Sequence, residues 1–97
     1  MNQTASLKVT GILKVKMETQ QVSDKFKKRE FVLTIDPTTP YPQNVLFQLT
    51  QDKCSLIDNK KIGDTLEVSF NLRGKEWNDH DNHTTKYFNT IEAWKIN

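Results

Sequence analysis

The sequence has 97 residues but only one cysteine, three glycines and no long apolar run. Because Cys54 has no cysteine partner, no internal disulfide can form, and we expect a reducing, cytoplasmic setting. A membrane-spanning helix would need about 18 consecutive apolar residues, and a signal peptide would need an apolar run after a basic start; neither pattern occurs. The scattered glycines form no phosphate-binding loop. These absences exclude a disulfide-stabilised scaffold, a helical membrane protein and a protein that holds phosphate in a glycine-rich loop.

Apolar residues make up only 35% of the chain, so the core must be thin and closed on itself. A chain of this length cannot be divided without leaving pieces too small to bury a core. We therefore expect a single domain over residues 6–97 after a frayed segment at residues 1–5. The net charge of +2 and the pI of about 8.7 permit nucleic-acid binding without requiring it.

Alternation of apolar and polar residues predicts strands with one buried and one wet face. We expect five of them, over residues 7–17, 30–36, 44–49, 66–73 and 86–96. Gly11 interrupts the apolar face of the first strand and predicts a bulge or bend, as a strand serving both edges of a small barrel would need. Gly74 should end the fourth strand.

The buried face of the fourth strand should carry Leu66, Val68, Phe70 and Leu72. On the last strand, Tyr87, Ile91 and Ala93 share one face, which we expect to be the core. Phe88 and Trp94 then stand on the outer face. Two outer aromatics predict a partner surface, a strand bulge or a cover from the N-terminal segment.

A short helix should follow the third strand, over residues 50–58. Thr50 is a candidate N-cap, and Cys54 and Ile57 offer one apolar face. The order is then three strands, a helix and two strands, which fits an all-β, five-stranded OB-fold barrel whose helix closes one end. An SH3-like barrel is the structural alternative.

No set of residues predicts catalysis or a cofactor. His80 and His83 lie near Asp79 and Asp81, but the spacing suits neither a zinc site nor a calcium loop, and a solvated loop is the better interpretation. No serine has a histidine nearby in the sequence. We expect a protein that is not an enzyme.

Nucleic-acid binding is the favoured interpretation, because OB-folds bind oligonucleotides on strands two and three and on two flanking loops. Those loops here are residues 19–28 and 76–85. Single-strand binding needs cations along the backbone path and aromatic planes for stacking. The candidate binding residues are Lys25, Phe26, Lys27, Lys28, Arg29, Thr34, Gln48, Arg73, Lys75 and Trp77.

Alternatives stay open for several of these residues. The lysine-rich loop is equally consistent with a solvated turn. Phe26 could cover the barrel, and Arg29 shares parity with Phe31 and could point inward and pair with an acid. Val32, Thr34, Leu46 and Gln48 offer no stacking plane, so the outer face is poorer in aromatics than that of a strong single-strand binder. Oligomerisation through Phe88 and Trp94 would add avidity.

Several segments also resemble a family of small OB-fold proteins of Bacteroides-type bacteria and their phages, DUF3127. The resemblance covers residues 7–96 and is carried by Thr19-Gln20-Gln21-Val22-Ser23, residues 26–34, Gln51-Asp52-Lys53-Cys54, Tyr87-Phe88 and Ala93-Trp94. It implies a protein similar to single-stranded DNA-binding proteins.

We therefore predict a protein that binds single-stranded nucleic acid, DNA rather than RNA in the first instance, in replication, recombination or repair. RNA as the ligand stays open, because the contact to the 2′-hydroxyl depends on geometry. The rival prediction is a protein–protein interaction or assembly module. It would not be retained on single-stranded DNA, whereas a backbone binder would elute progressively with salt.

Overall fold

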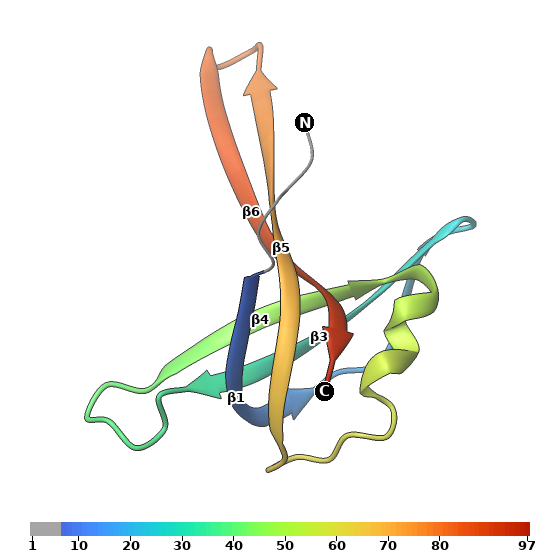
Figure 1. Cartoon of the computed structure of the whole chain (residues 1–97). Coiled ribbons are helices and arrows are strands. Elements are labelled where there is room, and N and C mark those ends of the chain that lie inside the picture. The colour runs from blue at the N-terminus through green and yellow to red at the C-terminus, as the bar shows by residue number, and fades with distance from the viewer. Residues whose placement is uncertain (1–6) are drawn as a thin grey trace.

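A computed structural model describes residues 7–97 as six strands and one short helix (Figure 1). The elements are β1 (Leu7–Lys16), β2 (Gln20–Ser23), β3 (Phe26–Ile35), β4 (Gln43–Thr50), the 3₁₀-helix η1 (Gln51–Ile57), β5 (Thr65–Asp79) and β6 (Thr84–Ile96). Among these residues, no helix has the length and apolar character needed to cross a membrane. The predicted frayed segment, residues 1–5, lies outside the described residues.

β1 closes the barrel because it pairs with a strand at each of its ends. Its first half, Leu7 to Ile12, is antiparallel to β5, and its second half, Ile12 to Lys16, is antiparallel to β3. The other neighbours within the barrel are β5–β6, β6–β4 and β4–β3, and β2 pairs with β3 outside it. Five strands thus form a closed barrel with a short helix between β4 and β5, which confirms the predicted OB-fold.

Gly11 lies where β1 changes its partner from β5 to β3, and the backbones of β1 and β3 are close together there. A Cβ atom at this position would lie 2.8 Å from the carbonyl oxygen of Thr34 and 3.2 Å from the Cβ of Leu33. The register irregularity itself comes later, between Leu13 and Val15. Alternation along β1 would place Val15 on the same buried face as Leu13, but the irregularity turns Val15 outward, with 36% exposure.

The core is a small set of apolar side chains around three aromatic rings. Phe31 and Phe47 stack with ring centroids 5.2 Å apart, and Phe70 meets Phe47 edge-on at 5.9 Å. The buried members are Leu13, Phe31, Leu33, Phe47, Leu49, Cys54, Ile57, Leu66, Val68 and Ala93. They fill the inside of the barrel, as the alternation predicted for most of them.

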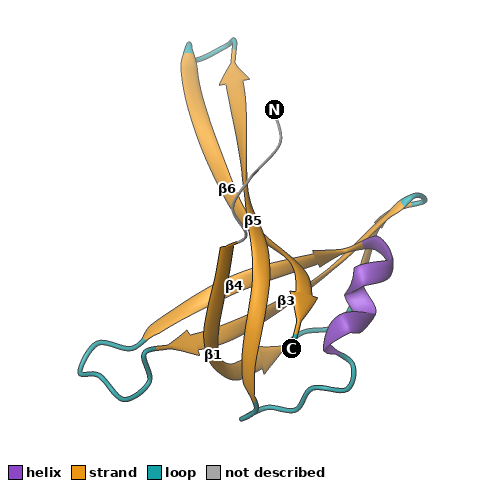
Figure 2. Cartoon of the chain, viewed as in Figure 1, coloured by secondary structure: helices purple, strands orange, loops and turns teal. Residues whose placement is uncertain are grey.

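η1 covers one end of the barrel through Cys54 and Ile57, as predicted (Figure 2). It is a 3₁₀-helix, and Thr50 occupies the N-cap position, as predicted, but its side chain makes no capping hydrogen bond. Burial raises the pKa of the Cys54 thiol, against smaller opposing effects of Lys27 and Arg29. The thiol therefore stays protonated and acts as a small apolar side chain.

The strands β5 and β6 run far beyond the barrel as a projecting hairpin (Figure 1). The predicted end at Gly74 was wrong, because Gly74 pairs with Asn89 and the ladder continues to Asp79 and Thr84. A register shift between Ser69 and Phe70 also breaks the expected alternation. Leu72 and Tyr87, both expected in the core, are 65% and 70% exposed because no barrel lies beneath the hairpin.

The segment predicted as a loop at residues 19–28 is largely a second, smaller hairpin. β2 pairs with the beginning of β3, so β3 starts at Phe26 rather than at Glu30. No alternation marks β2, whose four residues are all exposed. The pattern failed because a strand outside the barrel has no buried face to reveal it.

We predict that Gly11→Ala destabilises the protein by about 1–3 kcal/mol, because the new methyl group would overlap backbone at the barrel closure. The matched control is Gly74→Ala. The nearest atom to a Cβ at Gly74 is 3.8 Å away, so the free energy of unfolding should be unchanged or slightly higher. Urea unfolding of both variants measures the difference. Equal midpoints would show that Gly11 is not needed for closure.

Candidate nucleic-acid interface

The predicted cationic residues of β5 and its predicted aromatic residue lie on one face of the projecting hairpin. Arg73, Lys75 and Trp77 have the same parity on β5, and their partners on β6 are Thr90, Phe88 and Lys86. Directly paired residues point to the same side of a sheet. We call the set Arg73, Lys75, Trp77, Lys86 and Phe88 the basic face of the hairpin.

The aromatic rings of the basic face are open to solvent, with Trp77 46% and Phe88 55% exposed. The Lys86 ammonium lies 5.9 Å from the centroid of the Trp77 ring, within cation–π range. Phe88, predicted as an interface residue, is the direct partner of Lys75. Exposed rings among cations are the arrangement that single-strand binding requires. Sequence reasoning missed Lys86, because only the pairing register places it beside Trp77.

The basic face continues onto the barrel at Gln48. Gln48 on β4 is bridged to Glu92 on β6, and the Glu92 carboxylate accepts a hydrogen bond of 3.1 Å from Arg73 Nε. A shallow cavity of about 260 Å³ lies here, lined among others by Gln48, Arg73, Lys75 and Phe88. Three of the predicted binding residues are thereby brought to one surface.

The turn of the β2–β3 hairpin carries the predicted lysine cluster. Lys25 and Lys27 are exposed, while Phe26 and Lys28 are half-buried. The Gln51 side chain holds this turn, because its amide donates to the Lys25 carbonyl at 2.9 Å and accepts from the Lys27 backbone N–H at 3.2 Å. Gln51 was not among the predicted residues, since nothing in its sequence neighbourhood indicates a contact with residues 24 positions earlier.

Arg29 points into the barrel and is only 9% exposed. Its guanidinium donates to the Met17 carbonyl at 2.8 Å and the Cys54 carbonyl at 3.1 Å, and pairs with the Asp58 carboxylate. This confirms the inward alternative. The guanidinium joins η1 to the chain between β1 and β2 and is absent from the outer surface.

Thr34 lies apart from the two hairpins. Its hydroxyl donates to the Asn44 side-chain oxygen at 2.9 Å, at the end of the β3–β4 pair. Six residues of strand, about 20 Å, separate it from Lys28. The structure therefore does not bring Thr34 together with the other candidates.

Phe88 and Trp94 do not form one patch. Trp94 is the extra residue of a β-bulge, because Phe70 pairs with Ala93 and Ser69 pairs with Lys95, which confirms the predicted bulge. Phe88 and Trp94 are also six residues, or about 20 Å, apart along the strand. Phe88 lies on the projecting hairpin, whereas Trp94 lies on the barrel with 36% exposure, one residue after the buried Ala93.

The loop between β5 and β6 is a tight turn built on Asp79. The Asp79 carboxylate accepts hydrogen bonds from the backbone N–H groups of Asp81 at 3.0 Å and Asn82 at 3.3 Å. His80 and His83 are exposed. Within residues 7–97, no group of three or more histidine, cysteine, aspartate or glutamate side chains is placed to hold a metal ion.

The chain belongs to the family described as a domain of unknown function, DUF3127, whose model matches residues 8–97. This confirms the predicted family. Comparison with curated proteins finds no match.

Solved structures of two single-stranded DNA-binding proteins and of a PriB domain are similar in fold. The mitochondrial protein Rim1 of S. cerevisiae matches with a TM-score of 0.67 and 9% identity, over 96% of this chain and 92% of Rim1. The dimeric N-terminal domain of PriB from Thermoanaerobacter tencongensis gives 0.66 and 13%, over 98% and 96%. The Plasmodium falciparum SSB, in complex with ssDNA, gives 0.57 and 17%, over 95% and 89%. At these identities the likeness shows the fold alone.

We predict that Arg29→Gln lowers the free energy of unfolding by about 1–3 kcal/mol, because buried carbonyl groups lose their donor. Lys28→Gln, one residue away on the outer side, should change it by less than about 0.5 kcal/mol. Urea unfolding distinguishes the two variants. If both lose the same stability, the Arg29 contacts do not hold the barrel end together.

Proposed function

We propose that this chain is a non-enzymatic single-stranded DNA-binding protein with weak sequence preference that acts in replication, recombination or repair. The observation that carries the proposal is the basic face of the β5–β6 hairpin. Three cations and two exposed aromatic rings stand on one side of a two-stranded ribbon. Cations neutralise phosphates and rings stack on bases of any identity, so the surface suits a single strand with little dependence on its sequence.

The proposed path runs from the basic face of the hairpin across Gln48 to the lysine turn of β2–β3. Gln48 pairs with Glu30 on β3 and Lys28 lies two residues earlier on the same side of that strand. Lys25 and Lys27 end the path at the turn held by Gln51. The resemblance in fold to single-stranded DNA-binding proteins supports single-stranded DNA as the ligand.

The test is the salt dependence of oligo-dT binding. Arg73→Gln and Lys75→Gln should each weaken binding and reduce the slope of log affinity against log salt by about 0.7, the value for one phosphate contact on a single strand. Lys61→Gln is the matched control, since Lys61 is exposed and lies in the segment between η1 and β5, which joins the end of β5 that belongs to the barrel.

Binding can be followed by quenching of Trp77 emission in a Trp94→Phe background, because a stacked indole loses fluorescence on contact with a base. An unchanged salt slope in folded Arg73→Gln and Lys75→Gln variants would contradict the proposed path. Binding without any change in Trp77 emission would remove the indole from the set of stacking residues.

Self-association is a second candidate function, favoured by the opposite face of the same hairpin. This face carries Leu72 and Tyr87, the two most exposed apolar side chains of β5 and β6, and it contains no lysine or arginine. A surface without cations does not suit phosphates, but a second copy of the chain could cover its apolar area. The similar PriB domain is dimeric, which supports this use.

We expect Tyr87→Ser to shift the protein toward smaller species in sedimentation experiments. Trp94→Ala is the comparison, since the sequence predicted an interface at Phe88 and Trp94. A shift with Trp94→Ala alone would place the interface on the barrel instead. The same mass for wild type and both variants would contradict both interfaces.

A further inference from the structure

A small cavity opens where β4 and β6 separate. The two strands are joined by a single parallel bridge, Gln48 to Glu92. Before that bridge, β6 belongs to the projecting hairpin and follows β5 away from the barrel (Figure 1). The resulting cavity has a volume of about 240 Å³ and lies between residues 46–48 of β4 and residues 89–91 of β6.

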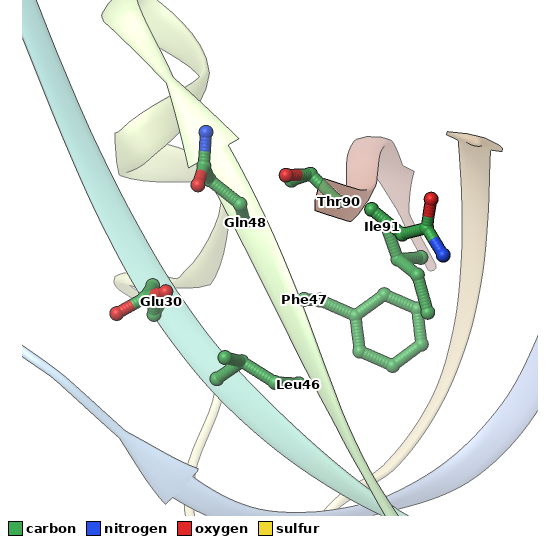
Figure 3. Close-up of a pocket in the computed structure, with 7 residues that line it drawn as sticks. Glu30, Leu46, Phe47, Gln48, Thr90 and Ile91 are labelled. Atoms are coloured by element: carbon green, nitrogen blue, oxygen red, sulfur yellow. The ribbon is translucent and has the colours of Figure 1, made fainter. Parts of the chain in front are cut away.

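The walls of this cavity combine apolar and polar side chains (Figure 3). Leu46 and Ile91 provide apolar walls from β4 and β6, and the buried Phe47 also lines the space. Gln48 and Asn89 bring one carboxamide each. Neither carboxamide forms a hydrogen bond with another group among residues 7–97, so both are available to a ligand.

Glu30 is the one charged residue that lines the cavity. Its carboxylate has no ion pair in the described part of the chain, where the two ion pairs are Arg29–Asp58 and Arg73–Glu92. It also lies on the proposed path, as the direct neighbour of Gln48 on β3. A carboxylate there repels phosphates, whereas it can accept hydrogen bonds from the donor groups of a base.

We propose that this cavity binds one base of the bound strand and that Glu30 makes it selective for guanine; the proposal rests on the proposed function. Guanine presents two adjacent donors, N1–H and the N2 amino group, which match the two oxygens of a carboxylate. Cytosine and adenine place a ring-nitrogen acceptor beside their amino group. Thymine places a carbonyl on each side of its N3–H. Each of these acceptors would face the carboxylate at close range.

The size and walls of the cavity suit a single base. Pockets for drug-sized ligands typically measure about 300–1,000 Å³, and this cavity is smaller. Leu46 can contact one face of a flat ring, and the carboxamide of Gln48, the residue paired with Glu30, can donate to the guanine O6. One selective position within a longer contact leaves the overall sequence preference weak.

The experiment compares oligo-dT with the same oligonucleotide carrying one central dG, at fixed salt. Wild-type protein should bind the dG oligonucleotide at least about fivefold more tightly, the lower end for a bidentate contact to a base. A central inosine, which lacks the N2 amino group, should lose most of this gain. Glu30→Gln should abolish the preference for dG while leaving oligo-dT affinity equal or higher, since it removes a negative charge near the phosphates.

Glu76→Gln is the matched control. Glu76 is exposed in the outer part of the hairpin, where it pairs with Tyr87, and it does not line the cavity. This variant therefore removes the same charge outside the cavity and should keep the preference for dG. Equal, salt-dependent binding of both oligonucleotides by wild type would overturn the guanine site and leave the proposed function standing. A preference that survives in Glu30→Gln would also overturn it. No binding of either oligonucleotide would overturn both proposals.

Discussion

The structure depends on one strand, β1, that pairs with β5 in its first half and with β3 in its second. A chain with so few apolar residues cannot stabilise an open sheet, so closing the barrel is what buries the aromatic core around Phe31 and Phe47. Closure brings the backbone of β1 within contact of β3 at Gly11, where a side chain would meet the Thr34 carbonyl. The two hairpins outside the barrel extend from strands of this closed barrel.

The β2–β3 and β5–β6 hairpins are positioned by different interactions. The β2–β3 hairpin is tied to η1 by the Gln51 amide, and the chain leading into β2 is tied by Arg29. The β5–β6 hairpin relies instead on its ladder, which is continuous from Phe70 to Asp79. The lysine turn is thus fixed by side-chain contacts to the barrel, whereas the basic face is fixed by strand pairing.

Pairing register also divides the charge of the long hairpin. Because Lys75 lies opposite Phe88 and Trp77 opposite Lys86, the cations and two of the aromatic rings fall on one side. Leu72 and Tyr87 fall on the other side, which has no cation. One ribbon therefore offers two chemically different surfaces, and the cavity beside Gln48 exists because this ribbon pulls β6 away from β4.

The sequence alone determined the barrel, the order of its strands and covering helix along the chain, and most of the core, because burial of one face imposes a period of two that can be read directly. The sequence did not predict strands that lack a buried face. β2 and the projecting part of the β5–β6 hairpin have none, so β2 was missed and β5 was predicted too short. The sequence named Gln48, Arg73, Lys75 and Trp77, but not that they meet. Only the tertiary structure decided the positions of Lys86 and Gln51 and the presence of the cavity between β4 and β6. These depend on strand register and on contacts between segments distant in the sequence.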